Sequence, residues 1–187
     1  MNRNERLAAD YRDMLKIQDR PYLSWVAVKG ELPYVEEYLL TVKLRSYALG
    51  VSSGRYVVGV VDRCTVKVTL WDSYPNVAPN VRMLSLPPVF HPAWYSKGTY
   101  CPPVPWRKDA SLKDYVMQML RTIRYEPELM DAAAPANYKA LDWYLKHRDS
   151  GLFESDQTEL SENTDEEAAA LEKAAGAFSE IIDSWGR

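Results

Sequence analysis

Hydrophobic residues recur along this chain at two spacings, one of three to four residues and one of two. The first spacing opens the sequence, and over residues 3–18 the apolar positions are Leu7, Tyr11, Met14 and Leu15. Such a pattern predicts a helix with one buried stripe. The basic side chains Arg3, Arg6 and Arg12 fall largely off that stripe, where charges usually face solvent.

The spacing of two dominates the next part of the chain and predicts four strands. They cover residues 25–28, 37–47, 56–71 and 81–84. In the second strand Tyr38, Leu40 and Val42 share one face, which is the alternation of a half-buried strand. Short turns separate the four strands, so we expect an antiparallel meander. Cys64 lies inside the third strand, and we assign it no chemistry.

Helical spacing returns after residue 110. Ser111 is a suitable N-cap for a helix over residues 112–125, and a further helix is predicted over residues 137–148. The apolar face of that further helix consists of Tyr138, Leu141, Tyr144 and Leu145. Residues 1–148 are therefore expected to form one α+β domain, with a proline-rich loop between the meander and these two helices.

The rest of the chain is acidic. Residues 149–163 are polar and predict a linker. Residues 164–187 begin with the capping-box pattern of Thr164 and Glu167 and predict an amphipathic helix. Its apolar stripe is Leu171, Ala174, Phe178, Ile181 and Trp185. A lone helix of this length is marginal in water, so it either docks on the body, which we favour, or binds a partner.

Charge divides the chain at the same place. The net charge is −3, and residues 149–187 hold eleven acidic and two basic side chains, a balance of −9, so the body carries +6. The body has no Lys/Arg-rich cluster of the kind that binds nucleic acid, and we expect no nucleic-acid partner. An acidic protein partner, or the chain's own tail, is the expected complement.

Composition narrows the class of protein further. The 187 residues are 47% hydrophobic, enough for one domain with a full core and an extension. Two cysteines in a chain of this size indicate free thiols and a reducing compartment. No apolar signal or membrane-spanning run is present, so a cytoplasmic protein without membrane contact is expected. With only His91 and His147 and no CxxC pair, no metal site is predicted.

Candidate chemistry centres on the proline-rich loop. It holds a His-Pro pair at His91 and Pro92 and, ten residues after the histidine, Cys101. A cysteine taken alone is more often a small buried thiol than a nucleophile. The ordered motifs around Cys101 favour the nucleophile.

Two motifs lie ahead of that cysteine, Tyr74-Pro75-x-x-x-Pro79 and His91-Pro92, and they resemble motifs of the ubiquitin-conjugating enzymes, which share the UBC fold. Tyr74-Pro75-x-x-x-Pro79 is similar to the turn after the family's third strand. His91-Pro92 is similar to the start of its His-Pro-Asn tripeptide.

The cysteine segment extends the resemblance. Gly98-x-x-Cys101 resembles the family's active-site segment, at the His-to-Cys distance common in the family, and Trp106 and the helix after it follow as they do there. The resemblance covers about residues 3–148. It implies a UBC-like fold with an N-terminal helix, a four-stranded antiparallel meander, an active-site loop and two C-terminal helices, to which the acidic helix is an addition.

The resemblance also implies a transferase. Cys101 would accept the C-terminal carboxyl of a ubiquitin-like protein as a thioester from an activating enzyme and pass it to an amine on an acceptor protein, with or without a ligase. A thiolate suits this role because it is a good nucleophile and also leaves well. No metal and no cofactor is implied. In the family, basic residues of the first helix contact the activating enzyme, and Arg3, Arg6 and Arg12 occupy that place here.

One departure concerns the charge that forms during acyl transfer. The family's asparagine after His-Pro, credited with supporting the oxyanion, is Ala93 here. An active enzyme would need another donor. The candidates are Tyr95, Trp94, Asn137 or a backbone amide. His91 is expected to hold the loop by hydrogen bonds rather than to act as a base.

A second departure follows the cysteine. Pro102 and Pro103 stand where the family often has Leu-Asp, and they remove two amide donors beside the nucleophile. The spacing from Cys101 to Trp106 is also shorter than in many members. These changes indicate a divergent member, and we expect a bacterial ubiquitin-like system, of the kind found in antiviral operons.

Two other classes of protein stay open. A catalytically inactive UBC-like module would bind or present a ubiquitin-like protein, which Ala93 favours and the retained Cys101 opposes. A cysteine hydrolase would need a histidine and an acid converging on the cysteine, and His147 is the only spare histidine.

Overall fold

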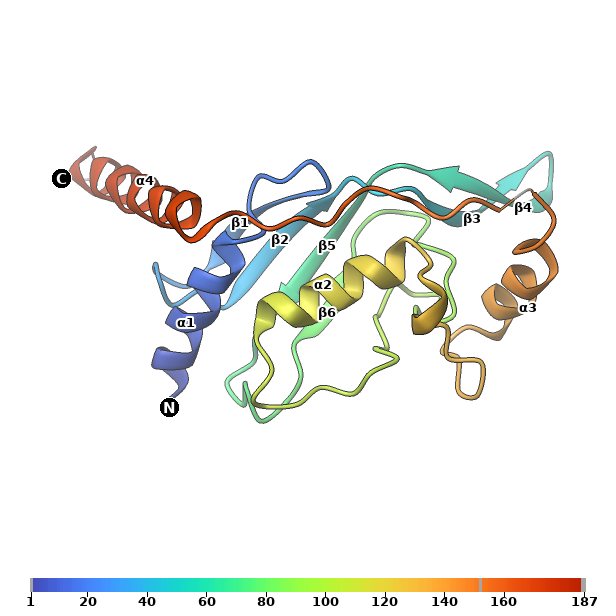
Figure 1. Ribbon diagram of the computed structural model, residues 1–187, viewed down its shortest axis with the longest axis horizontal. Helices are drawn as coiled ribbons and strands as arrows, with labels where there is room; N and C mark the ends of the chain where they lie inside the picture. Colours follow the sequence, from blue (N-terminus) through green and yellow to red (C-terminus); the bar gives the residue numbers. More distant parts are fainter. Residues whose placement is uncertain (1, 152, 186–187) are drawn as a thin grey trace.

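The computed structural model describes residues 2–151 and 153–185, the last eight of them by their helical backbone. Within these residues lie a four-stranded sheet, a separate two-stranded hairpin and four α-helices (Figure 1). The helices are α1 (Arg3–Leu15), α2 (Leu112–Ile123), α3 (Tyr138–His147) and α4 (Asp165–Trp185), with a 3-10 turn at Pro127–Leu129. The strands are β1 (Leu23–Lys29), β2 (Glu37–Val42), β3 (Ser46–Ser52), β4 (Arg55–Val61), β5 (Cys64–Thr69) and β6 (Asn80–Met83).

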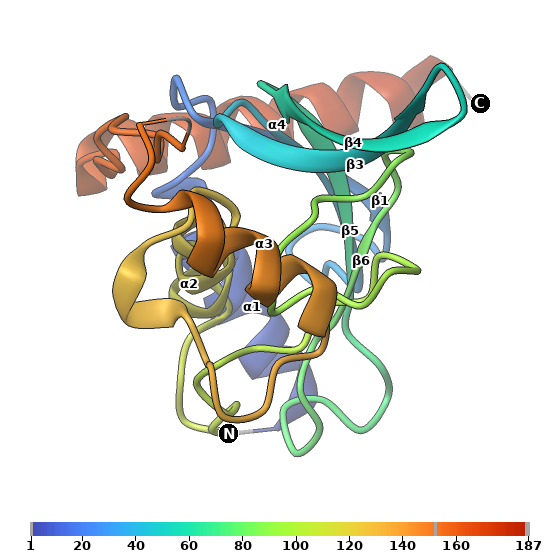
Figure 2. The ribbon, with the colours of Figure 1, turned by 90° about the vertical axis from the view of Figure 1, so that its right-hand side faces the viewer.

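The sheet is the predicted antiparallel meander, in the order β1-β2-β5-β6. Buried residues of neighbouring strands lie opposite one another, as Tyr38 does with Val68 and Leu40 with Val66. Helices α1, α2 and α3 lie on one side of the sheet (Figure 2). The main core, which includes Met14 of α1, is enclosed between the sheet and α1 and α2. The α+β, UBC-like class predicted from the sequence is confirmed.

The two long predicted strands are wrong in extent, because each is interrupted. Residues 37–47 divide into β2 and β3, and residues 56–71 divide into β4 and β5. At the break the pattern of burial changes sides, because Tyr47 is buried where the alternation of β2 would expose it. Tyr47 turns into a second, smaller cluster with Tyr125 and Tyr144. One uninterrupted strand face could not line both clusters, so the hairpin bends away from the sheet.

Helices α1 and α2 each begin directly after a residue whose side chain caps the first turn. In α1 the side chain of Asn2 accepts from Glu5 N (2.9 Å), and that of Glu5 accepts from Asn2 N (2.8 Å). In α2 Ser111 Oγ accepts from Asp114 N at 3.0 Å. Helix α1 ends at Leu15, three residues earlier than predicted, because the next amides bond to carbonyls three residues back and form a tighter turn.

Helix α3 buries less than its pattern predicts. Leu141 and Tyr144 are buried, but Tyr138 and Leu145 are exposed at 68% and 46%. Trp143, which lies beside that stripe in the sequence pattern, packs instead against the second cluster. The helix therefore covers the outer hairpin with one narrow edge.

Residues 153–163, predicted as part of a linker, form an extended strap along the body (Figure 1). Near its start Glu154 pairs with Arg45 at 2.5 Å. Further along, the carbonyl of Thr158 accepts from Arg124 Nη1 at 2.7 Å. The acidic strap thus pairs with basic residues of the body, which is the tail complement that the charge division predicts.

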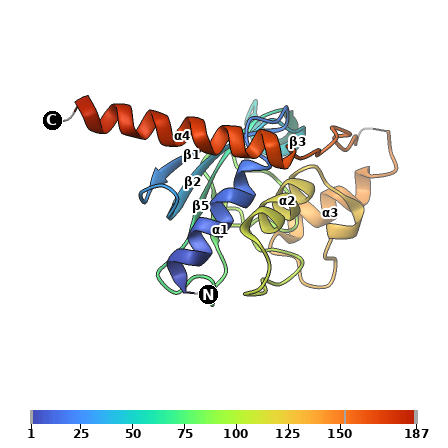
Figure 3. The ribbon, with the colours of Figure 1, turned by 60° about the vertical axis from the view of Figure 1, so that its left-hand side comes forward.

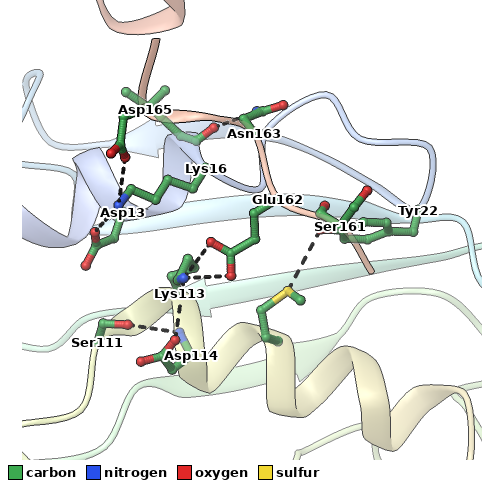
Figure 4. Close-up of polar contacts among 12 residues, drawn as sticks. Asp13, Lys16, Tyr22, Ser111, Lys113, Asp114, Ser161, Glu162, Asn163 and Asp165 are labelled. Carbon is green, nitrogen blue, oxygen red and sulfur yellow. Dashed lines mark hydrogen bonds and ion pairs between the residues drawn. The ribbon is translucent and has the colours of Figure 1, made fainter. Parts of the chain in front are cut away.

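The end of the strap is bonded to both α1 and α2 (Figure 4). Glu162 accepts from Lys113 of α2 at 2.7 Å. The Nδ2 group of Asn163 donates to the carbonyls of Leu15 and Gln18, both at 2.9 Å. Asn163 therefore caps the C-terminal end of α1, whose last carbonyls have no partner within the helix.

Helix α4 begins on α1 and runs outward beyond the body (Figure 3). Ala168 is buried at the contact. Two ion pairs flank it, Lys16 with Asp165 at 3.2 Å and Arg12 with Glu172 at 3.8 Å. The first turns of α4 are thus docked on the body, as favoured from the sequence.

The predicted apolar stripe of α4 is only partly described. Leu171 is half-buried and packs against the main core, whereas Ala174 is exposed. The side chains of Phe178, Ile181 and Trp185 lie outside the described part of the chain.

Candidate active site

The proline-rich loop leaves the sheet at the end of β6 and folds back on the same strand just before Cys101. Met83 N donates to the carbonyl of Gly98 at 2.7 Å, and Tyr100 N donates to the carbonyl of Val81 at 3.0 Å. Tyr100 is itself buried and packs on Trp94. The backbone on the N-terminal side of the cysteine is therefore fixed to the sheet.

A tight turn between Trp94 and Tyr100 makes this return possible. Tyr95 N donates to Thr99 O (2.9 Å), and Gly98 N donates to Tyr95 O (2.8 Å). Gly98 has a φ of +85°, and a Cβ at this position would lie 3.0 Å from the carbonyl oxygen of Met83. Both facts require glycine, because other residues rarely adopt this φ and have no room here.

Cys101 stands at the end of this fixed segment and is a partly exposed residue. Its backbone N–H donates to the carbonyl of Ala93 at 2.8 Å, which joins the cysteine to the segment that follows His91 and Pro92. That amide is therefore occupied, and the two prolines after it have none. Cys64, in contrast, is buried in β5, where desolvation raises the pKa of its thiol to about 12.

His91 is a structural residue of the loop. Its side chain is fully buried, and Nδ1 accepts from Ala93 N at 2.9 Å, which puts the ring proton on Nε2. The ring packs edge-on against Tyr125 at 4.5 Å between centroids. Burial lowers the pKa of His91 to about 3. A neutral, enclosed imidazole of this kind orients Ala93 and does not collect protons from solvent.

The predicted oxyanion donors fall into different environments. Trp94 is fully buried, with its indole N–H lacking a partner among the described residues. Tyr95 is 48% exposed at the turn beside the cysteine segment. Asn137 lies next to the His-Pro pair, since its backbone N–H donates to Pro92 O at 3.0 Å. Its side-chain oxygen caps α3, which leaves the amide NH₂ as a donor.

Trp106 holds the later part of the loop. Its indole N–H donates to the carbonyl of Pro75 at 2.8 Å, and its ring packs against Tyr74, 5.6 Å between centroids. The Tyr-Pro turn recognised in the sequence is thus the support on which the loop rests.

Arg6 is buried, which corrects the prediction that it contacts a partner from the surface. It pairs with Asp10 at 2.7 Å and donates to the carbonyls of Lys108 and Ala110. Asp10 in turn accepts from Leu112 N at 2.9 Å, at the first turn of α2. The pair ties α1 to the end of the loop. An i,i+4 arginine and aspartate on a helix resembles a surface pair in the sequence, and only its buried position reveals this role.

The other two basic residues of α1 are less enclosed. Arg3 is part-buried and pairs with Glu36 at 2.9 Å. Arg12 has a 61% exposed side chain, although Glu172 of α4 lies 3.8 Å from it. Arg3 also donates to the carbonyl of Leu70 at 3.2 Å, so the side chain of Arg12 is the more accessible of the two.

A groove beside the loop was not foreseen from the sequence. It has a volume of about 520 Å³ and is lined by Leu49, Tyr56, Phe90, Ser96, Asn137 and Trp143. Its walls come from the outer hairpin, the loop and the start of α3, three segments far apart in the chain. No sequence pattern signals such a meeting, because it follows from the bend between β2 and β3.

Within the described residues no group of His, Cys, Asp and Glu side chains is arranged to hold a metal ion. None of the described helices is both long and apolar enough to cross a membrane.

Comparisons with known proteins give a likeness in structure alone. No protein-family model matches the chain, and no curated protein matches it. The structure of S. cerevisiae Ubc12 aligns with a TM-score of 0.53 at 16% identity, over 78% of this chain and 74% of that one.

Two Plasmodium structures match over a smaller share of this chain. The Plasmodium vivax ubiquitin conjugating enzyme E2 aligns over 63% of this chain and 98% of its own, at 16% identity and a TM-score of 0.45. The ubiquitin conjugating enzyme E2 from Plasmodium falciparum aligns over 66% and 99%, at 17% identity and a TM-score of 0.48. At 16% identity the likeness to Ubc12 concerns the fold alone.

Proposed function

The chain has the fold of the ubiquitin-conjugating enzymes, and from that premise we propose that it carries a ubiquitin-like protein as a thioester on Cys101. The observation that supports this most is the setting of Cys101. The residue is partly exposed while its backbone is fixed, through Tyr100 to β6 and through its own amide to Ala93. A nucleophile that must meet a large acyl donor needs both access and a fixed position.

The proposed reaction has two acyl transfers. In the first, the thiolate of Cys101 attacks the thioester carbonyl of a ubiquitin-like protein held on an activating enzyme, and that enzyme's cysteine leaves as a thiolate. In the second, a lysine amine of an acceptor protein attacks the new thioester, the C–S bond breaks as an amide bond forms, Cys101 leaves as a thiolate, and the amine gives up one proton to solvent. The second transfer needs a neutral amine, because a protonated amine has no free electron pair.

Each tetrahedral intermediate carries an oxyanion that needs a donor. Ala93 supplies none from its side chain, and the amide of Cys101 is bonded to Ala93 O. Two side-chain donors remain among the sequence candidates, the hydroxyl of Tyr95, on the exposed turn, and the NH₂ of Asn137, whose backbone bonds to Pro92. We assign this function to one or both of these side chains.

Arg3 and Arg12 are the proposed contacts for the activating enzyme on α1. Their side chains are at least partly exposed, and both lie on the helix that the family uses for this purpose. Arg6 is excluded by its burial.

A charging assay tests the function. The full chain is incubated with ATP, an activating enzyme and the cognate ubiquitin-like protein, and adducts are resolved with and without reducing agent. We expect a thiol-sensitive adduct for wild type and for Cys64→Ser, and for Cys101→Ser an oxyester that resists reducing agent.

The alternative is an inactive module that binds a ubiquitin-like protein without covalent chemistry, which the missing asparagine at Ala93 favours. It predicts binding of the ubiquitin-like protein with no adduct on wild type. A thiol-sensitive adduct that persists in Cys101→Ser would also contradict the proposed role of Cys101.

A further inference from the structure

The outer hairpin, β3 and β4, exposes an unusual amount of apolar surface. Tyr56 is 80% exposed, Val60 55% and Val51 69%. No charged residue and no proline lies between Arg55 and Asp62. Proteins usually protect such strands with charges, prolines or bulges, because a bare apolar edge pairs with other strands.

Within the described residues the edge of β3 is covered at its start, whereas the edge of β4 is uncovered along its length. On the β3 side, Ala48 forms a bridge with Val89, and Phe90 N donates to Tyr47 O at 2.7 Å. On the other side, β4 pairs with β3 and with no further strand of the described residues. The free edge therefore belongs to β4.

The turn of the hairpin determines which groups face that edge. Ser53 and Gly54 both have positive φ, +50° and +76°, as a two-residue type I′ turn requires. The pair that closes the turn, Ser52 and Arg55, is a hydrogen-bonded pair, and the ladder continues without a bulge. Since hydrogen-bonded pairs alternate along an antiparallel ladder, the amides and carbonyls of residues 56, 58 and 60 point away from β3.

We propose that this edge pairs with β4 of a second copy of the chain, antiparallel and about a twofold axis at Val58. The pairing joins the two hairpins into one continuous sheet. Val58 then lies opposite Val58 of the second copy, and Tyr56 lies opposite its Val60. All three outward-facing residues find partners in this register, and each such pair exchanges two hydrogen bonds.

The sequence of β4 favours a second copy as the occupant because it is complementary to itself in this register alone. An aromatic residue opposite a β-branched one is a favourable cross-strand pair. A shift of the twofold axis to residue 59 would set Arg55 against Arg63 of the other copy. A shift to residue 57 would oppose Val60 to Gly54, which lies in the turn. Closed twofold pairing also leaves no open edge for further growth.

The proposed contact borders the groove beside the proline-rich loop. Tyr56 and Val58 form part of the groove wall, together with Ser96 and Asn137. In the paired form the second copy extends that wall and covers Tyr56, so the groove becomes deeper on the side of the hairpin.

Two cysteine variants in a Cys101→Ser background test the register. Val58→Cys places two cysteines opposite each other, about 5.5 Å apart between Cα atoms. Val57→Cys, on the same strand, lies diagonal to its counterpart at about 7–8 Å and falls outside disulfide range. Both full-length proteins are oxidised with copper phenanthroline and resolved on a non-reducing gel. Separately, the molar mass of wild type is measured by light scattering across a concentration series.

We expect the mass of wild type to rise from 21.5 kDa toward twice that value with concentration. Val58→Cys should form the covalent dimer at least tenfold faster than Val57→Cys. Val60→Lys should stay monomeric with an unchanged melting temperature, since its side chain is exposed. A wild type that remains monomeric at every concentration, or equal cross-linking of the two cysteine variants, overturns the proposal. Neither result depends on thioester chemistry, so the test is separate from that of the proposed function.

Discussion

Gly98 is the residue on which the position of Cys101 depends most directly. Its positive φ turns the chain, and its missing Cβ allows the loop to touch Met83. His91 acts by a different means. Its buried ring accepts a hydrogen bond from Ala93 N, and the carbonyl of Ala93 accepts one from Cys101 N. Neither residue reacts, yet each fixes a segment next to the cysteine.

Replacing Gly98 by alanine should therefore reduce stability. The substitution combines an unfavourable φ with a contact of 3.0 Å to Met83 O, and we expect a loss of about 1–3 kcal/mol in the free energy of unfolding. Urea titration measures it. Gly54→Ala shares the positive φ but has open space and should cost less, and Gly176→Ala, within α4, should be neutral or stabilising. Equal losses in all three variants would contradict the role of the Met83 contact.

His91 should make stability depend on pH. Its pKa is lowered to about 3 in the folded protein, whereas an unfolded histidine titrates near about 6.5. The folded-state pKa is lowered, so the unfolded chain binds the extra proton between these values. Stability is full above about pH 6.5 and is lost as the pH falls toward 3.

The His91→Asn variant isolates this contribution. We expect the difference in unfolding free energy between wild type and variant to shrink by about 2 kcal/mol from pH 7 to pH 5. Parallel curves for the two proteins would show that the histidine does not titrate in this way.

The residues of the site were foreseen unevenly from the sequence. His91 has a short-range role set by its neighbours in the loop, and that structural role was predicted, whereas Gly98 and Trp106 were recognised only through the family resemblance. Arg6 was misplaced, since a charged residue off the apolar stripe of a helix usually faces solvent. Its burial depends on Asp10 and on carbonyls about 100 residues away, which no local pattern records.

At the scale of elements, the strands show what a two-residue alternation of hydrophobic positions can predict and what it misses. Burial alternates correctly through β2 and β5, and the N-cap of α2 is Ser111, as predicted. The breaks before β3 and before β5 were missed. They arise because Tyr47 must face Tyr125, a residue far along the chain, and a strand with two different burial faces has to bend.

The strap was likewise underestimated, since polar residues that bond to distant carbonyls look the same in sequence as solvated ones.

The Asn163→Ala variant tests the attachment of the strap to the body. The change removes the side-chain donor that the carbonyls of Leu15 and Gln18 share, and only Leu15 O keeps another, Gln18 N, so the loss should cost about 1–3 kcal/mol. We expect faster hydrogen exchange in the strap and in the first turns of α4, with α2 unaffected. Gln157→Ala is the matched control, because its side chain bonds only to Ser155. Equal exchange in both variants would show that the cap does not hold the strap.

At the scale of the molecule, the acidic tail and the basic body are partners within one chain. The ion pairs that flank α4 are exposed, and each is worth about 0–1 kcal/mol. At 1 M salt the screening length falls to about 3 Å, which removes most of that attraction. Amide exchange over residues 165–177 should therefore quicken between 0.05 and 1 M sodium chloride, while residues 112–123 exchange as before. Exchange independent of salt would mean that the apolar contact at Ala168 suffices.

The strap also determines how tightly another protein must bind the face of α1 in order to displace α4. The helix touches the body through a few weak contacts, and alone it would associate poorly. The strap that precedes α4 is bonded to the body up to Asn163, so a detached α4 would stay within a small volume around its docking site. Short tethers of this kind correspond to effective concentrations on the order of millimolar. A protein that uses the same face of α1 must outcompete that local concentration, or first loosen the strap.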